Sequence, residues 1–230
     1  MEILTLRAPN PGPLTLEGTN TYLVGDTVID PGPDHERHLE NILGAGPVER
    51  IVLTHRHPDH CAGAGRLSEL SGSPILALGE GLQDGECISG LVAVHTPGHA
   101  SDHLCFWHPE GRTLFSGDLI AGTGSIMVAP PEGDLEAYVT SLQRVLALAP
   151  ARIMPGHGPE VPDAAAKIDE YLAHRREREE RVVAALESGA SSLGEVVDLA
   201  YAEVPAAMRP YARLSARAHL EKLGHRTLPA

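Results

Sequence analysis

The sequence predicts an α/β sandwich followed by a small helical region. Short β-branched and aliphatic runs alternate with helical segments up to about residue 160, as in proteins whose helices pack on β-sheets. After Pro162 the chain carries charged segments of helical period, and no strand pattern is evident. We therefore expect two regions: a catalytic-type α/β domain at residues 1–162 and a helical region at residues 163–230.

Short apolar runs bounded by turn residues predict the strands of the first region. Pro109–Arg112 lies between two of these runs and predicts a hairpin turn. The predicted strands are Thr21–Val24, Val28–Ile29, Ile51–Thr54, Ile75–Leu78, Leu91–His95, Leu104–Trp107, Thr113–Ser116 and Arg152–Met154.

Helical period predicts the remaining elements. A helix is expected over Cys61–Leu70, and another after Asp134, which is placed to cap it, with Pro150 following its end. In the second region, residues 163–187 predict a long charged helix whose solvated face is His174–Arg181. Ser191 and Ser192 with Glu195 form a capping-box signature for a helix through about Tyr201. A last helix is expected between Pro205 and Gly224, with Tyr211, Leu214, Ala218 and Leu223 as its apolar residues.

Composition narrows the class of protein. The chain has 230 residues, 42% of them hydrophobic, and no apolar run long enough for a transmembrane helix. Its formal charge of −13 argues against a broad nucleic-acid-binding surface, but not against a nucleic acid held locally by metal ions. The N-terminus does not resemble a signal peptide, and three cysteines without CxxC spacing suggest reduced thiols. We expect a cytoplasmic protein with no membrane association.

Metal-ligand side chains cluster directly after one predicted strand. In the segment Thr54–His60, His55 and His57 are two residues apart, so in extended chain they point to the same side. Asp59 and His60 follow where the chain turns into a helix and can face a second ion close by. Imidazole and carboxylate are ligands that zinc, iron or manganese accept.

Three further segments share one pattern, in which a strand is followed by glycine and then by a metal-competent side chain. They end in Gly98-His99, Gly117-Asp118 and Gly156-His157. Because sites in α/β proteins collect at the carboxyl ends of strands, we expect all these ligands to meet. The predicted metal ligands are His55, His57, Asp59, His60, His99, Asp118 and His157.

This HxHxDH–His–Asp–His set resembles the metallo-β-lactamase superfamily over residues 1–160. The resemblance implies an αββα fold, with His55, His57 and His99 on one metal, Asp59, His60 and His157 on the other, and Asp118 bridging. It also implies that Asp30 supports the site from outside the metal ligands. A turn-forming role for Asp30 before Pro31-Gly32 is an equally good interpretation.

Two such metals can bridge a hydroxide, because metal binding lowers the pKa of water to about 7. That hydroxide would attack a carbonyl carbon or a phosphorus atom, and Asp59 would bind metal and accept a proton as the catalytic residue. The sequence therefore predicts a binuclear metal-dependent hydrolase with two divalent ions, zinc first, and manganese or iron as alternatives.

Residues 13–23, residues 99–103 and the helical tail resemble the β-lactamase-like protein 2 subfamily. The resemblance implies a winged-helix-like tail and activity as an endoribonuclease, or phosphodiesterase, on single-stranded RNA. Only seven residues follow Leu223, so we expect the wing to be truncated or absent. The shortage of aromatic residues for base stacking (3%) argues against RNA.

Two alternatives stay open. One is a thioesterase of the hydroxyacylglutathione hydrolase (glyoxalase II) type, which shares the THxHxDH and HTPGHA stretches. The other is a metal-sensing, nucleic-acid-binding protein. The substrate is then a small-molecule ester or thioester or a single-stranded RNA, with Asn20 and His103 as candidate substrate-binding residues. A homodimer is compatible with the sequence, which does not fix the oligomeric state.

Overall fold

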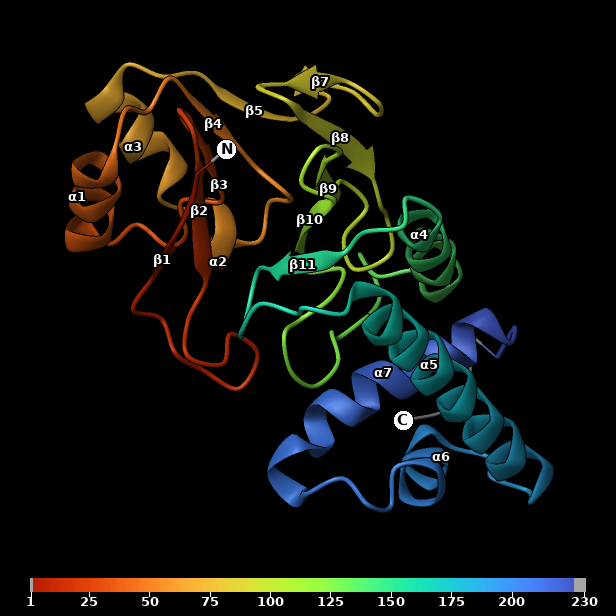
Figure 1. The fold of residues 1–230 in the computed structure, drawn as a ribbon. Helices are drawn as coiled ribbons and strands as arrows, with labels where there is room; N and C mark the ends of the chain where they lie inside the picture. Colours follow the sequence, from red (N-terminus) through yellow and green to blue (C-terminus); the bar gives the residue numbers. More distant parts are fainter. Residues whose placement is uncertain (1, 226–230) are drawn as a thin grey trace.

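The computed structural model describes residues 2–225, and the part up to Pro155 is built on two β-sheets (Figure 1). The first sheet has six strands in the order β1-β2-β3-β4-β5-β6. Its first three strands pair antiparallel, and β3, β4, β5 and β6 pair parallel. The strands are β1 Ile3–Arg7, β2 Asn20–Val24, β3 Thr27–Ile29, β4 Arg50–Val52, β5 Ile75–Leu78 and β6 Gly81–Leu82.

The second sheet has five strands in the order β11-β10-β9-β8-β7. Its strands pair antiparallel except for β10 with β11, which run parallel. The predicted turn Pro109–Arg112 does join β9 to β10, and the Arg112 amide donates to the Pro109 carbonyl at 3.1 Å. The strands are β7 Cys87–Ile88, β8 Leu91–His95, β9 Leu104–His108, β10 Thr113–Gly117 and β11 Arg152–Pro155.

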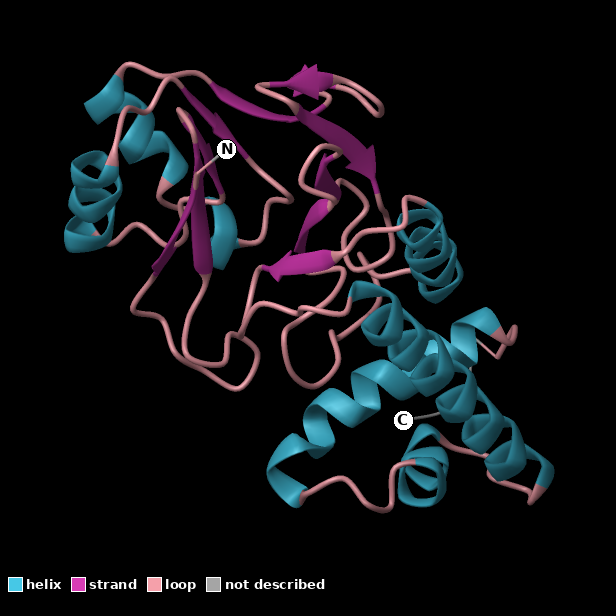
Figure 2. Ribbon diagram, viewed as in Figure 1, coloured by secondary structure: helices cyan, strands magenta, loops and turns pink. Residues whose placement is uncertain are grey.

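Helices cover the outer face of each sheet, so the layers run helix, sheet, sheet, helix (Figure 2). Leu39 of α1 (Glu36–Ala45) and Leu67 of α3 (Ala64–Ser71) share one core cluster with strands of the first sheet. Leu142 of α4 (Leu135–Ala147) shares another with the second sheet. A third cluster lies between the sheets and includes Tyr22 and Phe106. This is the αββα sandwich that the sequence predicts.

The region after residue 163 is helical throughout the part that the structure describes. It contains α5 (Ala164–Glu187), α6 (Leu193–Ala200), the 3-10 helix η1 (Ala206–Met208) and α7 (Arg209–Lys222). The first half of α5 packs in the core of the second sheet, and its second half packs with α6 and α7. This long helix therefore carries the small helical unit directly against the sandwich (Figure 1).

Several local predictions are confirmed, because short-range hydrogen bonds govern them. The Asp134 carboxylate accepts hydrogen bonds from the amides of Glu136 and Ala137, both at 2.9 Å, and so begins α4. The Ser192 hydroxyl accepts from the Glu195 amide at 3.2 Å and begins α6. Residues 163–225 contain no strand. The expected truncation of the wing falls on the residues after Leu223, of which 226–230 lie outside the described part of the chain.

Other predictions were incomplete or wrong. The helix α1 and the strands β1, β6 and β7 are not among the predicted elements. The helix expected over Cys61–Leu70 is two helices, α2 (Pro58–Cys61) and α3. In α7 the buried residues are Ala212, Ala216, Ala218, His219 and Leu220, whereas Leu214 is exposed.

Candidate metal centre

The candidate metal ligands come from both sheets and all follow the carboxyl ends of strands. His55 and His57 lie just after β4, and Asp59 and His60 lie on the short helix α2. His99, Asp118 and His157 follow β8, β10 and β11 respectively. Since Pro58 at the start of α2 needs no hydrogen-bond acceptor for its nitrogen, the helix can begin immediately after His57. The fold thereby brings four separate segments to the open edge between the two sheets.

The seven side chains form two adjoining clusters, each with its ligand atoms within 4.8 Å of one another. The first contains His55, His57, His99 and Asp118, and the second contains Asp59, His60 and His157. In the first cluster, His99 Nε2 lies 2.9 Å from His57 Nδ1. In the second, His60 Nε2 lies 3.2 Å from His157 Nε2.

Asp118 faces both clusters with different oxygens. Its Oδ2 lies 3.5 Å from His99 Nε2, while its Oδ1 lies 3.4 Å from His60 Nε2 and 3.3 Å from His157 Nε2. One carboxylate between two groups of imidazoles is suited to join two cations. The arrangement agrees with the division of ligands that the sequence resemblance implies.

The residues present fit a pair of divalent cations. His55 Nε2 and Asp118 Oδ1 are buried and have no hydrogen-bond partner among residues 2–225. Burying a polar atom without a partner costs free energy, and here bound metal ions would supply the partner of both atoms. Clustered imidazole nitrogens and carboxylate oxygens form a donor set suited to zinc, iron or manganese. We conclude that the two clusters make a binuclear metal site.

Four of the five ligand histidines have a hydrogen-bond partner on the ring nitrogen that faces away from the cluster. These pairs are His55 Nδ1 with Thr54 Oγ1 (3.0 Å), His57 Nε2 with Glu132 Oε2 (3.0 Å), His60 Nδ1 with Asp30 Oδ2 (2.8 Å) and His99 Nδ1 with the Met127 carbonyl (2.8 Å). Such contacts fix the tautomer and orientation of each ring. The fifth, His157, has no partner on its buried Nδ1 among residues 2–225.

Asp30 fulfils both of the roles considered for it. Its backbone has φ of 50°, as expected in a turn. Its side chain accepts from the Thr54 amide at 2.8 Å, from the Thr54 hydroxyl at 2.6 Å and from His60 at 2.8 Å. Asp30 therefore ties the end of the first sheet to the metal site.

Burial and charge set the protonation of these groups. Burial lowers the pKa of His55 well below its ordinary value, so its imidazole is neutral, as a metal ligand must be. Burial alone would raise the pKa of Asp118, but His60 and His157 outweigh it and hold that pKa well below the usual range. Burial likewise opposes the charge on His60, yet Asp118 and Asp30 raise its pKa well above the ordinary value. The carboxylates thus concentrate negative potential where cations would bind.

Asn20 and His103 lie beside the site, but their side-chain nitrogens form hydrogen bonds within the protein. The Asn20 amide donates to the carbonyls of Pro155 and Gly158, at 3.0 and 2.8 Å, and so holds the loop that carries His157. His103 Nε2 accepts from the Asp118 amide at 3.0 Å, and its Nδ1 lies 2.8 Å from the Thr96 hydroxyl. In this arrangement both side chains position metal ligands, and neither offers a free nitrogen to a substrate.

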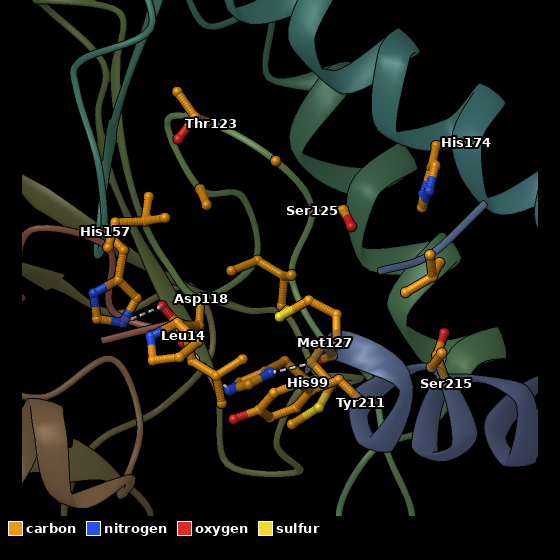
Figure 3. Close-up of a pocket in the computed structure, with 18 of the residues that line it drawn as sticks. Leu14, His99, Asp118, Thr123, Ser125, Met127, His157, His174, Tyr211 and Ser215 are labelled. Carbon is orange, nitrogen blue, oxygen red and sulfur yellow. Dashed lines mark hydrogen bonds and ion pairs between the residues drawn. The ribbon is translucent and has the colours of Figure 1, made fainter. Parts of the chain in front are cut away.

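A cavity of about 440 Å³ extends from the metal site to the helical unit. Its wall is largely apolar and comes from three places: the loop before β2, the loop after β10 and the C-terminal helices. In Figure 3, His99, Asp118 and His157 lie on one side of the cavity, while His174 and Ser215 lie on the other. The apolar lining residues are Pro13, Leu14, Leu16, Ala121, Ile126, Met127, Val204, Met208 and Ala212, and Tyr201 and Tyr211 add aromatic rings.

The sequence did not predict the outer partners Glu132 and Met127, nor the contribution of Tyr211 to the cavity. No local pattern marks these residues, since each meets the site from a distant segment. The run His174–Arg181 was expected to be solvated, and this is wrong for Arg175, which is 4% exposed. The helical period could have predicted the burial of Arg175, because it places Arg175 one turn after the buried Tyr171.

Comparison with known proteins agrees with this geometry. A family model described as "Metallo-beta-lactamase superfamily" matches residues 14–83 and 72–157, and one described as "Beta-lactamase associated winged helix domain" matches residues 192–226. A crystal structure of a metallo-beta-lactamase family protein from Thermus thermophilus superposes with a TM-score of 0.81 at 23% identity, covering 96% of this chain and 93% of that one.

Two curated relatives span most of the chain. A "Beta-lactamase-like protein 2 homolog" of Caenorhabditis elegans is 34% identical over 243 residues, covering 93% of this chain and 81% of the relative. An "Atrochrysone carboxyl ACP thioesterase" of Aspergillus fumigatus is 30% identical over 233 residues, covering 86% of this chain and 72% of that protein. The chain, with its His and Asp metal clusters and its helical tail, belongs to the metallo-β-lactamase superfamily.

Proposed function

We propose that this chain hydrolyses carboxylic thioesters or esters whose acyl group is largely apolar. The observation that carries the proposal is the cavity beside the metal site, where Leu14, Leu16 and Met127 line the wall next to Asp59 and Asp118. An apolar wall favours an acyl chain, because burying apolar surface is the main source of its binding free energy. A ribonucleotide chain would instead require cationic or stacking groups all along its phosphates and bases. Here the arginines and tyrosines of the cavity wall come only from the C-terminal helical region, while the wall next to Asp59 and Asp118 is apolar.

The metal site supplies the reactive chemistry of the proposed reaction. Two divalent cations held by the seven ligands, with zinc as the expected ion, would acidify a water molecule and polarise the carbonyl that it attacks. His55, His57 and His99 would hold one cation, and Asp59, His60 and His157 the other. The pairs His60–Asp30 and His57–Glu132 keep these rings oriented before the substrate enters.

Asp59 is the residue we assign to proton transfer. It lines the cavity, and its side chain is 29% exposed, so its carboxylate is open to water. Burial would raise its pKa, but the hydrogen bond with His157 and the charge of His60 lower it below the usual value. Asp59 therefore stays ionised near neutral pH and can accept a proton from the attacking water.

A phosphodiester in single-stranded RNA is the second candidate substrate. It is favoured by the 34% identity with the "Beta-lactamase-like protein 2 homolog" together with the subfamily resemblance noted from the sequence. The name of the Aspergillus thioesterase, by contrast, favours the thioester proposal. The charge of −13 weighs against a polyanionic substrate.

One set of parallel assays separates the two candidates. The zinc- and manganese-loaded protein is tested on S-octanoyl-N-acetylcysteamine, S-lactoylglutathione, bis(p-nitrophenyl) phosphate and a fluorescent single-stranded RNA. We expect turnover of the octanoyl thioester that disappears in Asp59→Ala and Asp118→Ala, while Asp102→Ala outside the clusters retains it. RNA cleavage that is lost in the same two variants, with inert thioesters, would overturn the proposal in favour of the second candidate.

A further inference from the structure

A buried arginine without a carboxylate partner lines the cavity next in sequence to His174, which lies across the cavity from Asp118 (Figure 3). Arg175 of α5 is 4% exposed and lines the cavity. Its Nη2 donates to the Ile126 carbonyl, and its guanidinium lies over the Tyr138 ring, 5.0 Å from the centroid. Its Nε has no hydrogen-bond partner, and it forms no ion pair with a carboxylate of residues 2–225.

The neighbouring side chains of the cavity wall offer no carboxylate to Arg175. His174, whose buried Nδ1 has no partner among residues 2–225, and Arg178 also line the cavity. The nearby Glu203 carboxylate is already engaged, since Arg178 binds it at 2.8 Å and Arg181 at 3.0 Å. A chain of charge −13 thus keeps a cationic group inside one cavity.

Burying a guanidinium without an anion costs free energy, because the charge loses its water without gaining an ion pair. The Ile126 carbonyl and the Tyr138 ring offset part of that cost in the free protein. A guanidinium also matches the geometry of carboxylate and phosphate oxygens, to which it can donate two hydrogen bonds at once. The missing partner is thus best supplied by a ligand.

We propose that Arg175, with His174 beside it, forms an oxyanion-binding subsite that recognises the end of the substrate farthest from the scissile bond. This inference rests on the proposed thioester or ester hydrolysis. The substrate then has a reactive carbonyl at the metal site, an apolar middle along Met127 and Tyr211, and an anionic group at Arg175. That group is either a carboxylate at the far end of the acyl chain or a phosphate on the alcohol or thiol portion.

Equilibrium binding tests the subsite independently of turnover. Calorimetry on the zinc-loaded full-length protein compares octanoate with dicarboxylates of increasing length from glutarate to sebacate. One carboxylate of each ligand can reach the metal site, so only the second reports on Arg175. We expect the best dicarboxylate to bind about tenfold more tightly than octanoate, as suits a charged hydrogen bond.

Matched variants locate the effect. Arg175→Gln should abolish the preference for the dicarboxylate, whereas Arg176→Gln, the same change on an exposed neighbour, should retain it. His174→Leu removes no hydrogen bond within residues 2–225, so it is the second variant if Arg175→Gln does not fold. It should reduce the preference by a smaller factor. A dicarboxylate preference that persists in the folded variants, or its absence in the wild type, overturns the subsite.

Kinetics then identify where the anion sits on the substrate. Three thioesters are compared: octanoyl and ω-carboxyoctanoyl thioesters of N-acetylcysteamine, and the octanoyl thioester of pantetheine 4′-phosphate. A higher kcat/KM that depends on Arg175 for the second or the third assigns the oxyanion to the acyl or the thiol side, respectively. Dicarboxylate binding without any thioester turnover would refute the proposed function and leave the subsite standing. Equal kcat/KM for all three thioesters would refute its role in substrate recognition.

Discussion

At the scale of single residues, the structure separates the metal ligands from the side chains that orient them. Asp30 illustrates the distinction, because its backbone makes a turn while its carboxylate binds His60 and Thr54. Asn tolerates the same left-handed backbone conformation, so the variant Asp30→Asn retains the turn. It replaces one carboxylate oxygen by an amino group that cannot accept from His60 or Thr54.

We expect Asp30→Asn to weaken binding of the metal at the Asp59, His60 and His157 cluster by about 10- to 100-fold. Metal content after dialysis against graded chelator concentrations measures this, with circular dichroism as a check on folding. Asp26→Asn, which contacts Arg50 away from the site, is the control. If Asp30→Asn retains metal as the wild type does, Asp30 serves only to form the turn and does not support metal binding.

Glu132 provides a second test at this scale, on the other cluster. Its carboxylate lies 3.0 Å from His57 Nε2, and its side chain is 66% exposed, so water screens the contact. We therefore expect Glu132→Gln to lower affinity at the His55, His57 and His99 cluster by about tenfold, the weak end of the range for such partners. Competition with a chromophoric chelator measures it, and Glu110→Gln on the exposed turn should leave the affinity unchanged. Equal affinities for the two variants would exclude a role for Glu132.

At the scale of elements, the turns that carry the ligands are held by close packing as well as by hydrogen bonds. Gly98, before His99, has φ of +136°, and a Cβ there would lie 2.3 Å from the Tyr138 Cα. The Asp134 amide also donates to the Gly98 carbonyl at 2.8 Å, which joins this turn to the start of α4. The backbone of a helix cannot move aside as a side-chain end can, so the position tolerates no side chain.

Gly98→Ala should therefore destabilise the chain by about 3 kcal/mol or more, from backbone strain and the clash combined. Gly90→Ala is the matched control, since Gly90 also has positive φ (+79°), but a Cβ added there would meet no atom within 4 Å. It should cost only the strain, about 1–2 kcal/mol. Urea unfolding of both variants measures the difference. Similar free energies of unfolding would show that the packing of α4 on this turn is unimportant.

Elements with a strong local signal were predictable, and those defined by distant contacts were not. Ile75–Leu78 and Leu91–His95 match the strands β5 and β8, and the Asp134 cap was expected because it needs only neighbouring residues. The strand β1 was not predicted, since it lies at the sheet edge with partly exposed residues and no alternation. The strands β6 and β7 are two residues each, too short to leave a periodic pattern.

The same difference applies to the site. Its seven candidate ligands were predictable because they follow strands. The carboxyl ends of these strands meet at one edge of the sandwich, independently of the loop conformations. Glu132 and Tyr211 were not, because their approach depends on how loops and the helical unit pack. Arg175 was assigned to solvent on the strength of its charged neighbours, although its helical position lies on the same stripe as Tyr171 and Val182. The prediction gave more weight to the charged neighbours than to the helical period, but the helical period determines which residues are buried.

At the scale of the whole molecule, α5 joins the core of the sandwich to that of the helical unit, and the two share the wall of one cavity. Among residues 2–225 no helix is long and apolar enough to cross a membrane. Because α7 and the segment before it line the same cavity as the metal ligands, anything that loosens the helical unit should also affect substrate binding. A titrating group inside that unit makes this coupling measurable.

His219 of α7 is such a group: it is fully buried, and neither ring nitrogen has a hydrogen-bond partner among residues 2–225. Burial, together with Arg175, Lys222 and Arg178, lowers its pKa from 6.5 to about 3. Glu179 lies 3.9 Å from its Nδ1 but is engaged by Lys222. Between these two pKa values the unfolded chain binds a proton that the folded chain does not, so stability falls as the pH decreases from about 6.5 toward 3.

We expect His219→Gln to remove this part of the pH dependence, leaving a variant less stable than the wild type at pH 7.5 but less sensitive to acid. Urea unfolding of zinc-loaded wild type and variant at pH 7.5, 6.5 and 5.5 measures it, and the difference between the two proteins cancels the metal ligands that both retain. His225→Gln, at the exposed end of the described chain, is the control and should follow the wild type. Parallel pH profiles for wild type and His219→Gln would mean that His219 titrates alike in the folded and unfolded states, and the packing of α7 would then have no part in the acid sensitivity of the molecule.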